Sequence, residues 1–132
     1  MRLLAPIDEN ADIVNRQSLP VEFRAIEKSS SFLMTGVTNG TYILDPGVAY
    51  ALTVIRIRNL RNTAVSGSCT ASFQNNGSNI TGLNTLSVTT TVLGNQTGSS
   101  NNTISVGNSL SLVISGATAT LNLVFNIDYT ET

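Results

Sequence analysis

The side chains that carry out most enzyme chemistry are scarce in this chain of 132 residues, which has no histidine and a single cysteine. Without histidine, a serine or cysteine nucleophile lacks its most frequent general base. Cys69 falls on the apolar side of an alternating segment, and we interpret it as a structural thiol. A glycan hydrolase would need two well-placed carboxylates, for which Asp45 and Asp128 are the candidates. We expect no catalytic residues, and therefore a protein that is not an enzyme.

The usual patterns of metal ligands do not occur in the sequence. A zinc site would need a set of cysteines and histidines, and a calcium loop would need the spacing D-x-D-x-D-G. Asp8, Glu9 and Asp12 are close enough in sequence to act together as acidic ligands, but we interpret them as a solvated charge cluster. We therefore expect neither a metal ion nor another cofactor.

Arg56, Arg58 and Arg61 place three of the seven positive charges within six residues. Such a strip either contacts an anion or a protein partner, or is a solvated strand face, and we treat it as a candidate partner-binding surface. The net charge is −1 and only 5% of the residues are aromatic. Nucleic-acid binding favours more positive charge and exposed aromatic side chains, and a nearly neutral chain is not drawn to anionic membranes. We expect neither partner.

A run of 66 residues, from position 62 to position 127, contains no charged residue. Serine, threonine and asparagine are abundant instead, with 15 Ser, 17 Thr and 15 Asn in the whole chain. Charged side chains normally protect sheet edges from unwanted pairing. Uncharged polar surface costs less to desolvate at a subunit contact than charged surface does. We therefore expect neighbouring subunits to cover this surface, and so a homo-oligomer.

Residues 1–19 differ from the rest of the chain, because they hold five charges and only small apolar groups without a sustained period. We interpret them as an extended N-terminal arm that needs a partner to order it. Two acidic residues interrupt any signal-peptide core, and no segment has membrane-spanning length. We therefore expect synthesis in a cytoplasm. The apolar residues of the arm are candidate partner-binding residues: Leu3, Leu4, Ile7, Ile13 and Val14.

From position 20 to position 132 the pattern is that of one β-sandwich domain. Apolar and polar residues alternate in short runs, as in strands with one buried face. The first run is PVEFRAIEK (20–28), in which Val21, Phe23 and Ala25 alternate with charged residues. Roughly eight to nine such strands, with turn residues every ~8–12 positions, predict an all-β fold. We expect an antiparallel β-sandwich of the jelly-roll type.

Turn residues and alternation also predict hairpins and the core. Asn39-Gly40 and Asn76-Gly77 are both typical of tight hairpins, and the polar segment 94–103 is predicted as a loop. The second hairpin lies in FQNNGSNITG (73–82), where Phe73 and Ile80 are expected in the core. The other inward positions that we predict are Val65, Gly67, Cys69, Ala71, Leu86, Val88, Val92, Leu110, Leu112, Ile114, Ala119, Leu121, Leu123, Phe125, Ile127 and Tyr129.

Two segments, SGSCTASFQNNGSNITGL (66–83) and NTISVGNSLSLVISGATATLNLVFNIDY (102–129), resemble a small β-sandwich domain that recurs in virion proteins of tailed bacteriophages. The shared pattern is an alternating strand after Gly, an N-G hairpin, I-T-G-L, a polar stretch, and V-G-[D/N]-x-L-x-L-V-I-S before a last alternating strand. Asn108 stands where the pattern favours Asp, so a role for a carboxylate at that turn is not carried over.

The resemblance implies a structural or binding role in a virus particle. Domains of this kind occur as capsid decoration or cement proteins, in head fibres and in tail fibres, often as trimers. We expect a homotrimeric capsid decoration protein on the virion surface, which binds the major capsid protein through the arm and the arginine strip. The alternative is a tail-fibre or head-fibre receptor-binding module, in which the loop 94–103 contacts host-surface glycans.

Overall fold

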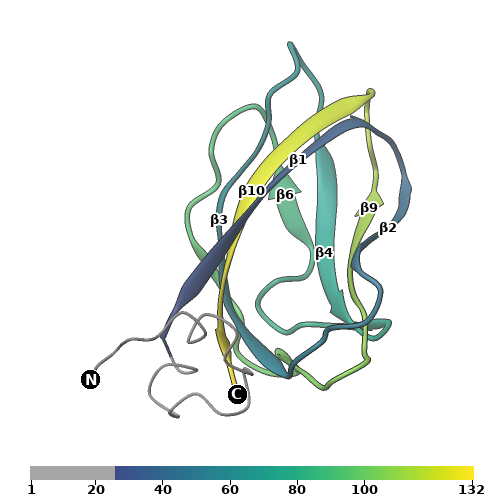
Figure 1. The fold of residues 1–132 in the computed structure, drawn as a ribbon. Helices are drawn as coiled ribbons and strands as arrows, with labels where there is room; N and C mark the ends of the chain where they lie inside the picture. The colour runs from purple at the N-terminus through teal and green to yellow at the C-terminus, as the bar shows by residue number, and fades with distance from the viewer. Residues whose placement is uncertain (1–25) are drawn as a thin grey trace, which may run out of the picture.

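A computed structural model describes residues 26–132, and its ribbon is drawn in Figure 1. This part of the chain contains ten strands and no helix. The predicted arm (1–19) lies outside the described residues, and so does the first part of the strand expected at 20–28. The candidate partner-binding residues of the arm are therefore also outside them: Leu3, Leu4, Ile7, Ile13 and Val14.

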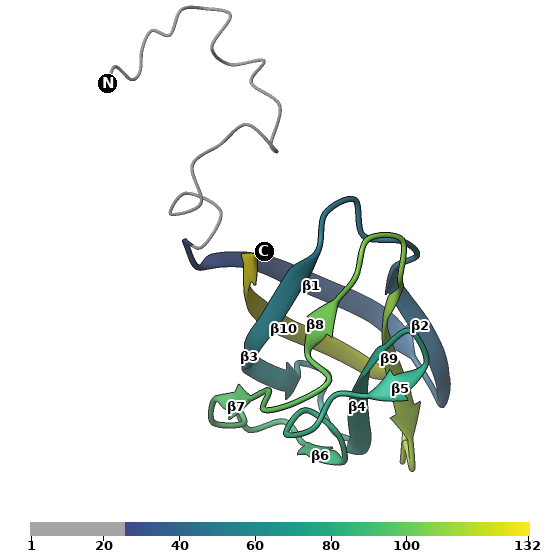
Figure 2. The same ribbon diagram turned by 90° about the horizontal axis from the view of Figure 1, so that it is seen from below.

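The strands form two antiparallel sheets that pack face to face, as Figure 2 shows from below. This arrangement confirms the predicted all-β antiparallel sandwich. The first sheet contains β1 (Lys28–Val37), β10 (Leu121–Glu131), β3 (Leu52–Asn62), β7 (Gln96–Thr97) and β8 (Thr103–Ile104). The second contains β2 (Gly40–Asp45), β9 (Leu110–Ser115), β4 (Cys69–Asn75), β5 (Ser78–Asn79) and β6 (Leu86–Val88).

The chain pairs from its two ends inward. Strand β1 pairs with β10, β2 with β9, β3 with β8, and β4 with β6. Strands β1 to β4 consequently alternate between the two sheets, as do β8, β9 and β10. This strand order is that of a jelly roll, a double-sheet sandwich in which consecutive strands cross from one sheet to the other.

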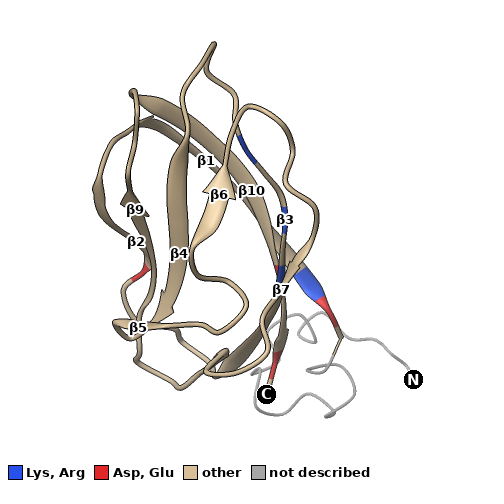
Figure 3. Cartoon of the chain, turned by 180° about the vertical axis from the view of Figure 1, so that it is seen from behind, with Lys and Arg blue, Asp and Glu red and all other residues tan. Residues whose placement is uncertain are grey.

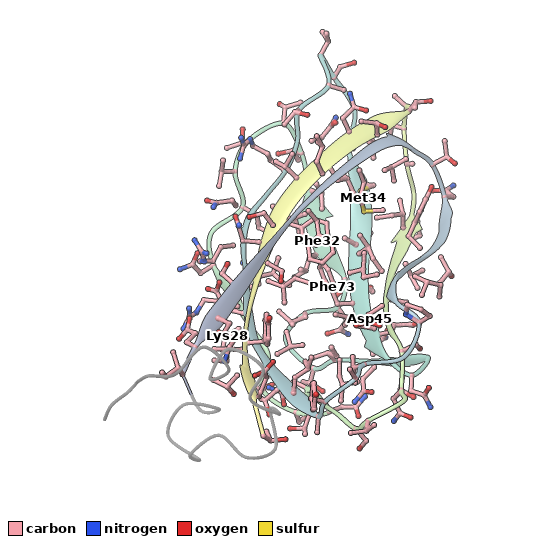
Figure 4. All side chains as sticks on the ribbon, in the orientation of Figure 1. Lys28, Phe32, Met34, Asp45 and Phe73 are labelled. Atoms are coloured by element: carbon pink, nitrogen blue, oxygen red, sulfur yellow. The ribbon has the colours of Figure 1, made fainter. Side chains whose placement is uncertain are left out.

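The core lies between the sheets, where the sequence alternation placed it. Phe73 of the second sheet meets the Phe125 ring of the first sheet edge-on, with centroids 5.3 Å apart. Phe125 also stacks on Phe32 at 5.0 Å. Figure 4 shows Phe32 and Phe73 pointing into the space between the layers. The predicted core residues that are buried are Cys69, Ala71, Phe73, Ile80, Leu86, Val88, Leu110, Leu112, Ile114, Leu121, Leu123, Phe125 and Ile127.

Three of the predicted core positions are wrong, because Val65, Val92 and Ala119 are exposed. All three lie outside the strands. Val65 and Ala119 are in the connections that enter β4 and β10, where the alternation is continuous in sequence but the chain has not yet joined a sheet. Gly67 and Tyr129 are only partly buried. Alternation with a period of two directs every second side chain into the core only where the segment is a strand of a sheet.

The predicted hairpin at Asn39-Gly40 is also wrong. Strands β1 and β2 belong to different sheets, so the chain crosses the sandwich at this corner. The Asn39 Oδ1 atom accepts a hydrogen bond of 2.9 Å from the backbone N–H of Ala117, in the connection that makes the opposite crossing. Both strands pair with the last two strands of the chain, which the local turn residues could not indicate. The prediction at Asn76-Gly77 is confirmed: both residues have positive φ (50° and 90°) between β4 and β5.

Candidate interaction surface

The three arginines of β3 lie on the outer face of the first sheet, and a β-bulge brings Arg61 to the same side as Arg56 and Arg58. Strict alternation would place Arg61 on the face opposite Arg56 and Arg58. The register with β10 shifts between Val124 and Asn126, where β3 advances by three residues. The extra residue is near Asn59, whose φ of 61° is left-handed. The bulge returns Arg61 to the outer side, opposite Val124. We call this outer surface of β1, β10 and β3 the arginine face.

Asp128 organises the arginine face. Its side chain is only 3% exposed, although it lies on the outer side of β10. Arg58 donates from Nε to Oδ2 at 2.6 Å and from Nη2 to Oδ1 at 3.0 Å, a two-point contact between guanidinium and carboxylate. Arg56 donates from Nη1 to Oδ2 at 2.7 Å. Two cations from β3 thus cover one anion from β10.

Arg56 also binds Glu27, which immediately precedes β1. The Arg56 guanidinium contacts both carboxylate oxygens of Glu27, with Nη2 to Oε1 at 3.4 Å. Lys28 forms an ion pair with Glu131 at 3.2 Å on the neighbouring strand. The point where the N-terminal segment joins the sandwich is therefore tied to the arginine face by ion pairs.

These contacts shift the protonation equilibria in consistent directions. Hydrogen bonds from Arg58, and then from Arg56 and Ser29, lower the pKa of Asp128, and they outweigh the desolvation that would raise it. The pKa of Arg56 is raised by its hydrogen bonds to Glu27 and Asp128, and that of Arg58 by its hydrogen bond to Asp128. The charged forms of all three side chains support one another.

Arg61 has different surroundings from the other two arginines. Among residues 26–132 it has no carboxylate within ion-pair distance, and its Nη1 donates to the Asn59 carbonyl at 3.4 Å. It lines a shallow depression of about 370 Å³ together with Leu33 and Asn126. Asn126 is fixed there, because it accepts from Asn59 Nδ2 at 2.9 Å and donates to Ser31 Oγ at 2.6 Å. Arg61 is the cation of the strip that this part of the chain leaves available to a partner.

Sequence reasoning found the three arginines but missed the carboxylates that hold two of them. Asp128 was assigned to the solvated side of its strand, and Glu27 to the first predicted strand. The signal that could have found Asp128 is its isolation, because it ends the uncharged run of 66 residues. A lone acid on the polar side of an Asn- and Thr-rich strand needs a cationic neighbour if it is buried.

The outer face of the second sheet carries no charge on its three longest strands except Asp45, at the end of β2. Figure 3 shows this contrast between the two sheets. The cross-strand pairs place Ile43, Ser111 and Gln74 in one row. Ile43 is 57% exposed. This is the uncharged surface for which the sequence predicts subunit contacts, and we call it the neutral face.

The remaining reactive groups have structural surroundings. Asp45 Oδ1 accepts from the Gly47 N–H at 3.1 Å and so closes the turn at Asp45-Pro46-Gly47. Asp45 and Asp128 line separate depressions, so they do not face each other as a catalytic pair would. Cys69 is buried, and desolvation raises the pKa of its thiol. Within the described range, no group of His, Cys, Asp and Glu could hold a metal ion.

Residues 26–132 include no helix that is long and apolar enough to cross a membrane. Comparisons with protein families, with curated proteins and with solved structures found no match to this chain. The class of protein therefore follows from the fold and the surfaces alone. The chain contains a jelly-roll β-sandwich with one outer face that carries several charges and one on which Asp45 is the charged residue of the three longest strands.

Proposed function

We propose that this chain is a capsid decoration protein of a tailed bacteriophage, which binds the head through its N-terminal segment and its arginine face. The observation that carries the proposal is the contact between Arg56 and Glu27. It anchors the base of the N-terminal segment on the same surface as Arg58 and Arg61. The chain therefore enters the sandwich beside the arginine face, which is one of the two groups of residues expected to bind a partner.

The charge distribution supports a role in assembly. The arginine face presents Arg61 to a partner, while Arg56 and Arg58 are held in place by Asp128. The neutral face can pack against another copy at low desolvation cost. In the proposed homotrimer, copies contact one another through uncharged surface and the major capsid protein meets the charged surface. The resemblance of segments 66–83 and 102–129 to phage virion domains gives the proposal its biological setting.

The copy number in purified particles tests this function. Quantitative mass spectrometry of intact virions, and of heads separated from tails, would measure how many copies each fraction holds. A decoration protein is expected in hundreds of copies on the head. A handful of copies confined to the tail would overturn the proposal.

Deleting residues 1–19 and replacing Arg61 by Ala should each reduce binding to heads that lack the protein. The matched control is Lys28→Ala, which removes another cation of β1 and β3 but one that is paired with Glu131. Binding that is unchanged by both the deletion and the Arg61 substitution would contradict the assigned surface.

The alternative is a fibre module that binds a host-surface glycan. The segment 94–103 gives this alternative little support, because it is bonded to the sandwich: Gly98 N–H donates to the Ile55 carbonyl at 2.8 Å, and Asn102 Nδ2 to the Val54 carbonyl at 2.8 Å. The depression beside Arg61 favours it more, because Ser31, Asn59 and Asn126 offer hydroxyl and amide groups there. Retained binding to host cells after deletion of residues 1–19 would favour this function.

A further inference from the structure

The core of the sandwich is incompletely covered on the side where β1 and β2 lie. Within residues 26–132, each of these strands is hydrogen-bonded to one neighbouring strand, β10 for β1 and β9 for β2. Figure 1 shows the two strands diverging from the corner that joins them. Phe32 and Met34 on β1, and Tyr42 and Leu44 on β2, pack against the core but remain partly exposed. In the described part of the chain, two strand edges without a partner strand thus border a group of core residues that are partly exposed.

An apolar opening of about 240 Å³ lies between these edges. Its apolar lining comes from both sheets and includes Phe32, Leu44, Val48, Leu52, Leu110 and Ile127. Ser30, Asp45 and Glu131 are among its polar lining residues. Val48, Leu110 and Ile127 form its buried floor, at 2%, 6% and 3% exposure. A dry apolar cavity of about 150 Å³ takes up benzene, so this opening has room for an aromatic ring.

We propose that residues 20–25 of a second copy of this chain occupy the opening, adding a strand beside β2. The segment PVEFRA alternates Val21, Phe23 and Ala25 with two charged residues, so one side of a strand formed there would be apolar. Six residues in extended conformation span about 20 Å, and β2 also has six residues. Strand addition would satisfy the free edge of β2 while Phe23 fills the opening.

The occupant comes from another copy because of where the described chain begins. The Glu27 carboxylate is bound by Arg56 on the outer face of the first sheet, whereas the opening is lined by side chains of the inner faces. To fill its own opening, the chain would have to reverse direction immediately before Glu27. Residues 21–27 contain no Gly, Asn, Asp or Pro, which are the residues that favour tight turns. A second copy removes the need for that turn.

Cysteine cross-linking in the full-length protein tests the exchange. A Phe23→Cys chain and an isotopically labelled Leu44→Cys chain are refolded together and mildly oxidised, and disulfide-linked peptides are identified by mass spectrometry. The expected product joins position 23 of one chain to position 44 of the other. Native Cys69 is buried and not expected to take part. If Leu44→Cys fails to fold, Asp45→Cys at the same rim replaces it.

The matched control is Leu33→Cys, because Leu33 is exposed (69%) on β1 but outside the opening. Little linkage from position 23 to position 33 is expected. Equal linkage to positions 33 and 44, or the absence of any linkage to position 44, would overturn the proposal. The inference does not depend on a role in decoration, because a failed cross-link leaves binding to heads untouched.

Discussion

The two sides of the sandwich differ in how the gap between the sheets is covered. On the side of β3 and β4, the segments 79–84 and 96–104 close the gap between the sheets. Ile80, Leu83 and Ile104 on these segments are fully buried. Ser99 N–H donates to the Thr81 carbonyl at 2.8 Å, and Thr81 N–H to the Ser100 carbonyl at 3.0 Å, so the two segments are also bonded to each other. We call this the closed side.

The other side, bordered by β1 and β2, has no such cover among residues 26–132, and we call it the open side. Several of its hydrophobic residues are only partly buried, and ion pairs as well as the β1–β10 ladder hold its N-terminal end. The two segments that cover the closed side, 79–84 and 96–104, contain no charged residue. The comparison shows a jelly roll that its own loops complete on one side, whereas cover for the other side rests on the strand exchange proposed above.

Truncation of a core residue should have the largest effect and should separate the two sides. Ile80→Ala on the closed side is expected to lower the free energy of unfolding by about 2–5 kcal/mol, because it leaves a cavity in fully buried packing. Leu44→Ala on the open side should cost less than half of that, since Leu44 is only partly buried. Urea denaturation followed by circular dichroism in dilute solution would measure both. Equal losses would contradict the distinction between the sides.

A pair of glycines with the same φ tests the close packing of Gly82 against the Thr97 backbone on the closed side. Gly82 and Gly77 both have φ of +90°, but a Cβ at Gly82 would lie 2.1 Å from the Thr97 carbonyl oxygen, whereas nothing lies within 4 Å at Gly77. Gly77→Ala should cost roughly 1–2 kcal/mol for its left-handed conformation. Gly82→Ala should cost that amount plus about 1–3 kcal/mol for the clash.

Thermal unfolding would measure the two glycine variants side by side. If they lose the same stability, the segments 79–84 and 96–104 are not packed together in solution. Slower hydrogen exchange at the amides of Thr81 and Ser99 than at exposed loop amides would support the packing independently.

Removal of one amide side chain should have a moderate effect. Asn102 donates from Nδ2 to the Val54 carbonyl at 2.8 Å and so fastens the closing segment to β3. Asn102→Ala should lower the free energy of unfolding by about 1–3 kcal/mol, because a partly buried acceptor loses its partner. The control is Asn95→Ala, an exposed position in the same loop, which is expected to stay within about 0.5 kcal/mol of the wild type. Similar losses in both variants would argue against the contact.

The smallest expected effect is a pH dependence at the base of the open side. The pKa of Asp128 is lowered by its arginine partners from its unfolded value near 3.8. Its ionised form therefore adds stability that is fully present above pH 4, and that is lost as the pH falls through the folded-state pKa. Asp128→Asn should flatten the loss of stability below pH 4, as measured by urea denaturation across pH 2–6.

The comparison variant for this titration is Asp45→Asn, which removes a carboxylate from outside the arginine face. Its profile should follow that of the wild type more closely than the profile of Asp128→Asn does. Sodium chloride should weaken the wild-type contribution only modestly, because Asp128 is almost completely covered. A wild-type profile that is already flat below pH 4 would contradict the assigned ion pairs.

The sequence determined the strands and the core of this protein. Alternation with a period of two in Cys69–Phe73, Leu110–Ile114 and Leu121–Ile127 was sufficient, because a sheet can bury only every second side chain. Asn76-Gly77 specified its hairpin by itself, since positive φ at both residues is a local property. The absence of charge from position 62 to position 127 likewise covers β4, β5, β6 and β9, which are four of the five strands of the second sheet.

Tertiary structure alone decided the partners of those strands. The ion pairs of Asp128 with Arg56 and Arg58 join residues 72 and 70 positions apart, and no local pattern specifies such a contact. A bulge near Asn59 placed Arg61 on the outer face of the first sheet, whereas strict alternation predicts the inner face. Asn39-Gly40 forms a corner between the sheets rather than a hairpin, because β1 pairs with β10 and β2 pairs with β9. Register, bulges and sheet membership depend on contacts between distant segments, and burial of one shared core selects among them.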